Sequence, residues 1–463
     1  MPTMINQPSI RTIWNVVRVV KITMGLTFGL YLFTYGPYFY DKFGGDGSFR
    51  TAILLTSILL AVRQGLIALL EVPTGAVGDA VGRVNTVILS LTFRLLFFVG
   101  LAALALFNAL PVTITIAVAV SIFFSLAYTF YSGTFTAWCV DSVRERAPDI
   151  GYEQILARGY TYEFVSQIFG AIIGIACYHF ELSYLAFLLA AFVCLTCVVY
   201  CRGAMDEVKS IKFLNRNVLN ISETAGRMRE IISVGMRTCR RSTLIFWLIL
   251  CFASYMFLVN VVDYLWPVYL TTTLSGNMQT PCWMGMAILI FVMCMAGSHT
   301  LTLLSARWKR RNGPETYNAA LRRWFICGCF LSALPIVITG LLTKYGVNAF
   351  YGFIFAVLAV SYCYGLLAPC YEILLNKYIP DENSGERATI MSWGSMVKGL
   401  LVLALAIPAG GRSGAATIIG WVIPGLLLLF ASIITNYYLK RGEAKYLEEK
   451  SRIKKPVEAT DMI

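Results

Sequence analysis

The most informative stretch of this chain lies at residues 71–83 and reads Glu71-Val-Pro-Thr-Gly75-Ala-Val-Gly-Asp79-Ala-Val-Gly82-Arg83. It separates two long apolar runs, near residues 51–74 and 84–107, and is predicted to be a short loop between antiparallel helices. Glycines allow the tight backbone geometry that such a loop needs. An acid and a base placed there can pair with neighbouring helices and with helix ends.

Composition extends the helical prediction to the whole chain. Of the 463 residues, 58% are hydrophobic and 14% are charged, and the mean hydropathy is +0.69. A soluble chain is typically about 45–50% apolar and about 25% charged, which excludes a cytosolic enzyme, a disordered regulator and a secreted domain. Because backbone groups in lipid must be satisfied within their own segment, the fold class is predicted to be an all-α polytopic membrane protein.

Long apolar runs predict twelve membrane-spanning helices, with six before residue 202 and six after residue 242. The spans lie near residues 22–40, 51–74, 84–107, 111–138, 154–178, 182–201, 243–269, 282–305, 324–343, 346–375, 388–409 and 416–438. The division is a six-helix half at 1–201, a basic cytoplasmic linker at 202–241, a second six-helix half at 242–439 and a charged cytoplasmic tail at 440–463. For the linker, an amphipathic helix on the membrane surface and a solvated segment are equal alternatives.

The distribution of basic residues predicts the orientation in the membrane. If the N-terminus is cytoplasmic and the spans alternate, the outer loops hold only four of the 38 Lys and Arg residues, namely Lys42, Arg50, Lys344 and Arg412. Thirty others fall in cytoplasmic segments. This bias places both termini in the cytoplasm. It also explains the net charge of +13 without a nucleic-acid partner.

The loop at residues 71–83 resembles the signature loop of the major facilitator superfamily, which has the form Gly-x-x-x-Asp-x-x-Gly-Arg. The matching residues are Gly75, Asp79, Gly82 and Arg83. Two departures are Ala80 and Val84, which stand where the family usually has basic residues. Two further segments are similar to segments of a bacterial drug and metabolite subgroup of that family. They are Ser132-Gly-Thr-Phe-Thr-Ala137-Trp138-Cys-Val-Asp141, and Asn376 to Pro380 followed by Arg387 to Ser392.

The resemblance covers the whole chain and implies a secondary transporter of the inner (cytoplasmic) membrane that works as a monomer. By resemblance, Asp141 and Arg83 belong to a cytoplasmic charge network that latches the two halves in the outward-facing state. The gating residues it implies are Gly75, Asp79, Gly82, Arg83, Asp141 and Arg387. Alternating access by rocking of the halves would be the mechanism.

Charged side chains inside the spans are the candidates for function, because each costs on the order of 3 kcal/mol or more unless paired or functional. Arg63, beside Gln64, lies midway in the second span, Glu163 lies in the fifth and Lys398 in the eleventh. Arg94 in the third span is expected to support the second, fourth or fifth span from behind, or to snorkel. An ion pair between Arg63 and Glu163 is the structural alternative to duty in substrate or proton binding.

The balance of these charges is positive, and that favours a carboxylate, a phosphate or a zwitterion as substrate. Glu163 is the leading candidate for proton coupling and Asp263 the second. Tyrosines suit a mid-sized organic ligand, although anchoring at the lipid interface is the alternative. The predicted substrate-binding residues are Arg63, Gln64, Tyr31, Tyr35, Tyr131, Lys398 and Tyr364.

Absent motifs narrow the function further. The sequence has no Gly-x-x-x-x-Gly-Lys-Ser/Thr loop for ATP and only two histidines, so neither a metal site, a cofactor nor an enzyme activity is predicted. The leading prediction is a proton-coupled transporter of an organic anion or zwitterion, with efflux slightly favoured. The alternatives are an importer of an organic acid, a nutrient or a carboxylate siderophore, and a transporter-like sensor that binds without transporting. The partners predicted are a small-molecule substrate, protons and the lipid bilayer.

Overall fold

A computed structural model describes residues 8–43, 49–106, 114–146, 151–207, 221–273, 279–312, 316–344, 350–379, 386–409 and 422–453. Throughout these ranges the regular structure is helical and no strand is present. Ten of the helices are long and apolar enough to cross a membrane by length and composition. The prediction of an all-α polytopic membrane fold is confirmed.

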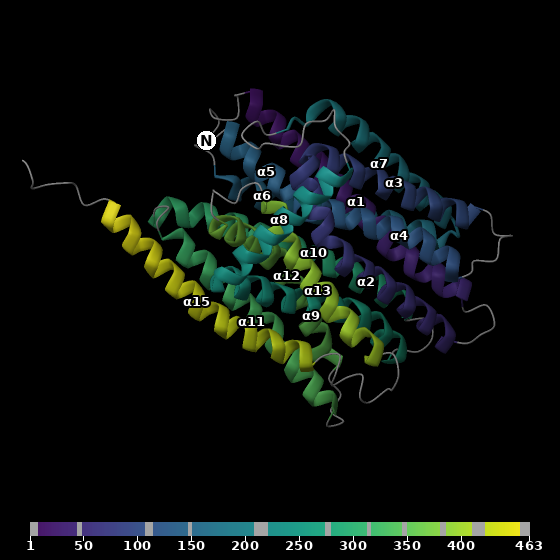
Figure 1. Ribbon diagram of the computed structural model, residues 1–463. Coiled ribbons are helices and arrows are strands. Elements are labelled where there is room, and N and C mark those ends of the chain that lie inside the picture. The colour runs from purple at the N-terminus through teal and green to yellow at the C-terminus, as the bar shows by residue number, and fades with distance from the viewer. Residues whose placement is uncertain are drawn as a thin grey trace, which may run out of the picture.

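The helices form two groups that meet along one interface (Figure 1). The N-terminal half contains α1 (Pro8–Phe43), α2 (Phe49–Val81), α3 (Arg83–Leu106), α4 (Ile114–Tyr131), α5 (Thr134–Arg146), α6 (Tyr152–His179) and α7 (Ser183–Ala204). The C-terminal half contains α9 (Thr243–Thr273), α10 (Gln279–Asn312), α11 (Tyr317–Lys344), α12 (Phe350–Tyr378), α13 (Arg387–Ala409) and α15 (Ile423–Ile453). Between the halves, α2 packs against α13, and α6 packs against α10 and α12.

One sequence prediction about local structure is wrong, and one predicted span contains a break. The segment at residues 71–83 is not a loop, because α2 continues to Val81 and only Gly82, with φ +123°, separates it from α3. The fourth span is not continuous, because α4 ends at Tyr131 and α5 begins at Thr134. At this break Gly133 has φ +74°, a conformation that favours glycine. A Cβ at Gly133 would also lie 2.9 Å from the Ala388 carbonyl oxygen of α13.

Small residues let helices within each half approach closely. In the N-terminal half α1 lies along α6, where a Cβ at Gly170 would collide with the Leu26 carbonyl oxygen. In the C-terminal half α10 lies along α12, where a Cβ at Gly365 would collide with the Cys294 carbonyl oxygen. The packing of α1 on α6 fixes the position of Lys21 and Glu163, which form an ion pair between these two helices.

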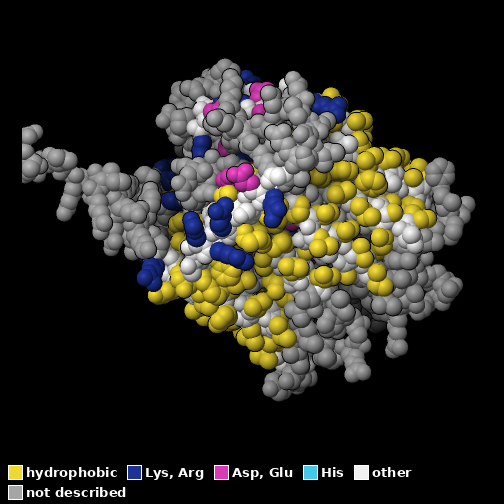
Figure 2. Space-filling model, viewed as in Figure 1, with side chains coloured by type: hydrophobic (Ala, Val, Ile, Leu, Met, Phe, Trp, Pro, Cys, Tyr) yellow, Lys and Arg dark blue, Asp and Glu magenta, His cyan; other side chains and the backbone are white. Residues whose placement is uncertain are grey.

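The surface separates into an apolar region and a basic end. Figure 2 shows a broad hydrophobic surface, with most of its Lys and Arg side chains toward the end where α8 and the last turns of α15 lie in Figure 1. This end, which also holds the Arg83 turn, is the one that the charge bias predicts to be cytoplasmic. We refer to it below as the predicted cytoplasmic end.

The linker contains a helix, α8 (Ile221–Arg241), that lies over the junction between the halves. Its Ile231 is buried against Ala76 and Ala80 of α2. A Cβ added at Gly235 would lie 3.2 Å from the methyl group of Thr389 on α13. One alternative for the linker was an amphipathic helix on the membrane surface. The helix is amphipathic, but its apolar side packs against α2 and α13. Residues 208–220 lie outside the described part of the chain.

Candidate functional site

A buried charge cluster joins the two halves at the predicted cytoplasmic end. Arg83, at the start of α3, is completely buried and forms ion pairs with Asp141 of α5 and, at 3.2 Å, with Asp79 of α2. Arg387 of α13 places its Nε atom 3.3 Å from Asp141. One acid of the N-terminal half is therefore shared by a base from each half. We call Asp79, Arg83, Asp141 and Arg387 the latch.

The latch also uses the first turn of α13 as an anion site. Asp79 Oδ2 accepts hydrogen bonds from the backbone N–H of Thr389 at 2.9 Å and from its hydroxyl at 3.0 Å. Free N–H groups at a helix N-terminus favour a negative charge. Gly75 makes the approach possible, because a Cβ there would lie 2.7 Å from Ser392 Oγ. The structure therefore brings all six residues of the predicted gating set to one junction.

Glu207, just after α7, is a member of this region that the sequence reasoning missed. Its carboxylate accepts hydrogen bonds from the backbone N–H groups of Arg83 at 3.2 Å and Val84 at 2.9 Å, and so caps α3. Burial raises the pKa of Glu207 above its ordinary value, although these two bonds oppose the rise. Nothing in the local sequence distinguishes it from the other acids of the linker.

A second charge pair lies deeper, between α1 and α6. Lys21 Nζ is 2.8 Å from Glu163 Oε2, and the Lys21 side chain is 5% exposed against 20% for Glu163. The Arg63–Glu163 ion pair that the sequence left open is not formed, because α1 lies along α6 and brings Lys21 to Glu163 first. Lys21 was missed because the first span was expected to begin at residue 22, whereas α1 begins at Pro8.

The C-terminal half adds a carboxylate to this pair. Tyr160 of α6 donates its hydroxyl hydrogen bond to Glu372 of α12 at 2.7 Å, and Thr136 of α5 donates to the same oxygen at 3.3 Å. Lys21 lies 4.0 Å from the centre of the Tyr160 ring and interacts electrostatically with Glu372. Lys21 of the N-terminal half is thus placed near a carboxylate from each half. This arrangement cannot be predicted from the spans taken one at a time.

Lys21→Gln is expected to destabilise the fold by about 3 kcal/mol, because it removes the cation of a buried pair and leaves Glu163 uncompensated. The measurement is equilibrium unfolding in mixed detergent micelles. Lys21→Arg, which keeps the charge, should lose much less. The double variant Lys21→Gln/Glu163→Gln should recover part of the loss, and an unchanged loss in the double variant would contradict the pairing.

Arg63 lies at a separate place, between α2, α1 and α4. It donates a hydrogen bond to the Tyr31 hydroxyl, and its guanidinium carbon is 4.6 Å from the centre of the Phe124 ring. The neighbouring Gln64 is 3.4 Å from Asn260 of α9, a contact between the halves. The structure therefore brings Arg63 together with Tyr31 and places Gln64 beside them on α2. Tyr35 is on α1, but its side chain is outside the described part.

One face of α4 collects cations from three other helices. Residues 124, 128 and 131 are four and three apart, so their side chains share this face. The three pairs, with distances from the charge to the ring centre, are Arg63 of α2 with Phe124 at 4.6 Å, Lys398 of α13 with Tyr128 at 4.6 Å, and Lys21 of α1 with Tyr131 at 6.0 Å. Aromatic faces stabilise such cations. The positive character expected of the interior is therefore concentrated along α4.

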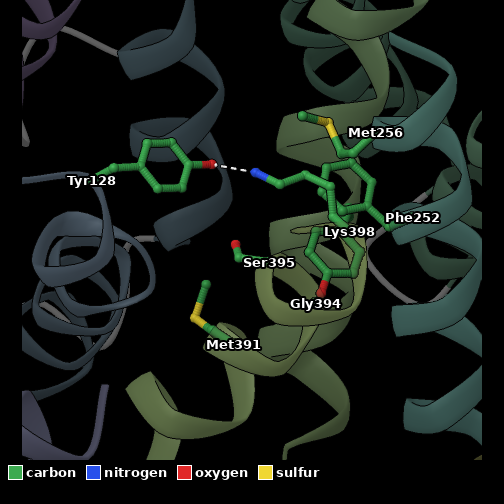
Figure 3. Close-up of a pocket in the computed structure, with 8 residues that line it drawn as sticks. Tyr128, Phe252, Met256, Met391, Gly394, Ser395 and Lys398 are labelled. Carbon is green, nitrogen blue, oxygen red and sulfur yellow. Dashed lines mark hydrogen bonds between the residues drawn. The ribbon is translucent and has the colours of Figure 1, made fainter. Parts of the chain in front are cut away.

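Lys398 lies in a small pocket between the halves (Figure 3). Its ammonium group points toward Tyr128 and donates a hydrogen bond to the hydroxyl oxygen at 2.9 Å. Apolar and aromatic side chains form most of the wall, which is lined by Tyr128, Phe252, Met256, Tyr371, Met391, Gly394, Ser395 and Lys398. The Tyr371 hydroxyl is buried with no hydrogen-bond partner in the described part of the chain. A buried cation beside aromatic rings and an unsatisfied hydroxyl suits an aromatic anion.

The remaining candidates are distributed over the bundle. Tyr364 of α12 meets Phe164 of α6 edge-on, with ring centres 5.7 Å apart. Tyr131 stacks on Phe135, and its buried hydroxyl lacks a hydrogen-bond partner among the described residues. Asp263 is exposed on α9 and takes no part in the Lys21 cluster. No hydrogen bond or ion pair joins Asp263 to Glu163 in the described part of the chain, although both acids act electrostatically on Tyr364.

Arg94 does not support the second, fourth or fifth span, and it does not snorkel. Its Nε donates to the Thr27 hydroxyl at 3.0 Å and its Nη2 to the Met24 carbonyl oxygen at 3.3 Å, both on α1. The side chain is buried between α3 and α1. Arg94 therefore holds α1 in place from outside the candidate site.

Comparison with known proteins gives matches of structure alone. No family model matches the sequence, and no curated protein matches it either. The human organic anion transporter MFSD10 (TETRAN) is 16% identical with a TM-score of 0.66, and the match covers 93% of this chain and 100% of that chain. A D-xylose-proton symporter is 13% identical with a TM-score of 0.64, covering 92% and 97%. The fucose:proton symporter of E. coli is 12% identical with a TM-score of 0.60, covering 91% and 98%.

The chain shares its fold with these three transporters. These similarities span almost the whole length of both partners, so they cover both halves and the junction between them. In the described part of this chain, that junction holds the latch, the cluster of Lys21, Glu163 and Glu372, and the Lys398 pocket. None of these three matches bears on the bacterial drug and metabolite subgroup.

Proposed function

We propose that the protein is a proton-coupled secondary transporter that moves a mid-sized organic anion or zwitterion by alternating access. The observation that carries this proposal is Lys398, a buried cation of the C-terminal half that faces Tyr128 of the N-terminal half across a pocket. In this fold, substrates bind between the halves near the middle of the membrane. An organic anion transporter and two proton symporters share the fold, which is consistent with this choice.

The proposed substrate contacts are the side chains along α4 and around the pocket. Arg63 and Lys398 would supply positive charge, and the polar and aromatic contacts would come from Gln64, Tyr31, Tyr35, Tyr131 and Tyr364. Each cation can accept an anionic group through charge-assisted hydrogen bonds. The latch would hold the predicted cytoplasmic side closed, as the resemblance to the gating motif implies.

Proton coupling is proposed at Glu163, with Asp263 as the second candidate. Glu163 shares Lys21 with Glu372, and the Tyr160–Glu372 hydrogen bond joins the halves. A proton that neutralises Glu163 would leave Glu372 as the ionised partner of Lys21. The attraction between Lys21 of the N-terminal half and Glu372 of the C-terminal half would then be stronger. This link between protonation and the relative position of the halves is what coupling requires.

The direction proposed from the subgroup resemblance is efflux, and import of an organic acid, a nutrient or a carboxylate siderophore is the alternative. The proposed location is the inner (cytoplasmic) membrane with both termini inside, and the working unit is a monomer. The proposed division of the chain is residues 1–201 and 242–439 as the two moving halves, with 202–241 as linker and 440–463 as tail.

Counterflow in proteoliposomes tests the proposal. Vesicles loaded with benzoate, benzenesulfonate, glutamate or tetraphenylphosphonium are diluted into the same labelled solute, and a pH gradient is then applied. Exchange of an anion or of glutamate, driven to net flux by the gradient, is the expected result, and the sign of the flux gives the direction. Exchange of tetraphenylphosphonium alone would contradict the anion proposal. Binding without exchange would show a sensor.

A further inference from the structure

Glu71 is a buried carboxylate that the proposed function does not use. It lies on α2, and its side chain is completely buried. Neither carboxylate oxygen has a hydrogen-bond partner of ordinary geometry within the described residues. The polar groups that act on it are the hydroxyls of Ser132 and Ser395 and the charge of Lys398. Burying a carboxylate without compensation is costly, so its charge state must depend on those neighbours.

Lys398 of α13 is the cation that acts on Glu71 of α2, and it also lines the pocket. The two helices touch beside these residues, because a Cβ at Gly399 would lie 2.9 Å from the Ala68 side chain of α2. Ser395 and Lys398 are one turn apart on α13, and both contribute to the pocket wall. Ser132 and Ser395 place their hydroxyl oxygens 3.0 Å apart, bridging the α4–α5 break and α13. Glu71 is not part of the wall itself. A solute in the pocket would therefore meet Lys398 directly and would feel the Glu71 charge without touching it.

An anion in the pocket changes the balance of charge at Lys398. With the pocket empty of solute, Lys398 can compensate an ionised Glu71 while it donates to the neutral Tyr128 hydroxyl. An anion bound to Lys398 would put two negative charges beside one cation in a low-dielectric interior. Protonation of Glu71 removes one of those charges, and it is the response open to a group that cannot reach water.

We propose that Glu71 is the internal counter-ion of Lys398 and that an organic anion entering the pocket replaces it, so that Glu71 takes up one proton for each anion bound. This inference rests on the proposed function. It adds a direct link between substrate and proton at one site, separate from the Lys21–Glu163–Glu372 cluster. Anion and proton then move in the same direction, so the inference rests on the anion binding and proton coupling of the proposed function and favours import over efflux.

The other charged groups around Glu71 are accounted for. On α2 itself, Arg63 lies about two turns away and contacts Tyr31 and Phe124, and Asp79 lies about two turns away in the opposite direction within the latch. From α13 the facing charge is Lys398, and from α4 the facing titratable group is Tyr128. Lys21 and Glu163 are paired with each other between α1 and α6. Lys398 is therefore the cation that stabilises the ionised form of Glu71.

The proposal has a defined pH dependence. Anion binding requires a protonated Glu71, so affinity is constant at low pH, where Glu71 already carries its proton. Once Glu71 is ionised in the unliganded protein, affinity falls by about tenfold for each further unit of pH. Binding in that range takes up about one proton per anion.

Calorimetric titration of the purified full chain with benzenesulfonate measures this proton directly. The sulfonate stays ionised across the usable pH range, so any linked proton goes to the protein. Titrations in buffers of different ionisation enthalpy give the number of protons taken up. At a pH where Glu71 is ionised before the anion binds, we expect about one in the parent protein, and at lower pH we expect none. In Glu71→Gln we expect binding to persist with no proton uptake and with an affinity that no longer depends on pH.

Two comparison variants separate this proposal from its neighbours. Glu181→Gln makes the same chemical change at an exposed turn after α6 and should keep both the binding and the proton. If instead Glu163→Gln removes the proton uptake and Glu71→Gln retains it, the inference is overturned and Glu163 remains as the coupling group. Binding of benzenesulfonate to the parent protein without proton uptake at any pH overturns the inference alone. Failure of every anion to bind also overturns the proposed function.

Infrared difference spectroscopy supplies a test that does not depend on a variant that folds. Benzenesulfonate binding to the parent protein should produce the carbonyl band of a newly protonated carboxyl group. Where Glu71→Gln folds, that band should be missing from its spectrum. A parent spectrum without the band at a saturating concentration of benzenesulfonate would contradict the proposal.

Discussion

Lys398→Gln should raise the dissociation constant of benzenesulfonate by roughly 10- to 150-fold. The reason is the loss of one charge-assisted hydrogen bond, which contributes about 1.5–3 kcal/mol. Lys398 has three donors, and in the described part of the chain one of them is used by Tyr128 at 2.9 Å. The side chain is 4% exposed, so water cannot replace it as a partner for the anion. Calorimetric or thermal-shift titration of the purified protein measures the change.

Two controls separate the charge of Lys398 from its contribution to packing. Benzenesulfonamide has nearly the same shape as benzenesulfonate but carries no charge, so its weaker binding should not depend on Lys398. Tyr128→Phe removes the hydroxyl that Lys398 binds and leaves the aromatic ring, so anion binding should survive. Equal losses for the sulfonate and the sulfonamide would mean that the variant had distorted the pocket, and the role of Lys398 as an anion anchor would be rejected.

The sequence was sufficient for the fold because each span has its own signal. Long apolar runs mark the helices, and the basic linker at residues 202–241 marks the division. It was insufficient where the signal is local and small. The break in the fourth span depends on Gly133, whose left-handed backbone gives no interruption in hydrophobicity. The start of α1 at Pro8 is hidden because the first fourteen helical residues include Arg11, Arg18 and Lys21.

The candidate site shows what single spans cannot predict. Arg63 and Glu163 were identified as charges at membrane depth, and both lie inside the bundle. Their partners, however, depend on which helices pack together. Because α1 packs closely against α6, Glu163 forms an ion pair with Lys21. Arg63 donates a hydrogen bond to Tyr31 instead of pairing with Glu163. Arg94 of α3 likewise binds a helix that the sequence did not indicate, because its Nε donates to Thr27 of α1.

Glu71 illustrates the opposite case, in which the residue was quoted and its meaning was missed. It opens the segment that resembles the family's signature loop, and a charge beside a turn is ordinary. The structure extends α2 through this segment, and that extension buries Glu71 beside α13. The importance of the carboxylate therefore follows from the length of α2 and from the position of α13, which begins 316 residues further along the chain.

Arg83→Gln should shift the protein toward the conformation that is open at the predicted cytoplasmic end. Arg83 is fully buried with Asp79 and Asp141, and removing the cation of such a cluster costs about 3–5 kcal/mol because it leaves the acids uncompensated. In the proposed mechanism α13 covers Asp79 and Asp141 only while this end is closed, and water reaches both acids once it opens, so most of the cost of losing Arg83 falls on the closed state. A shift of 3 kcal/mol changes the ratio of closed to open states by roughly 150-fold. The change is large enough to reverse the populations.

Distances between spin labels on the exposed ends of α5 at Glu145 and α10 at Arg310 report the opening. The labels are introduced as unnatural amino acids, because the chain has 13 cysteines. Arg146→Gln is the matched control, since its ion pair with Asp206 is 3.9 Å long and Asp206 is 79% exposed, so we expect no change of distance. A broad or longer distance in Arg83→Gln alone supports the latch. Identical distance distributions in Arg83→Gln and Arg146→Gln would show that the latch stabilises the fold without determining which conformation is populated.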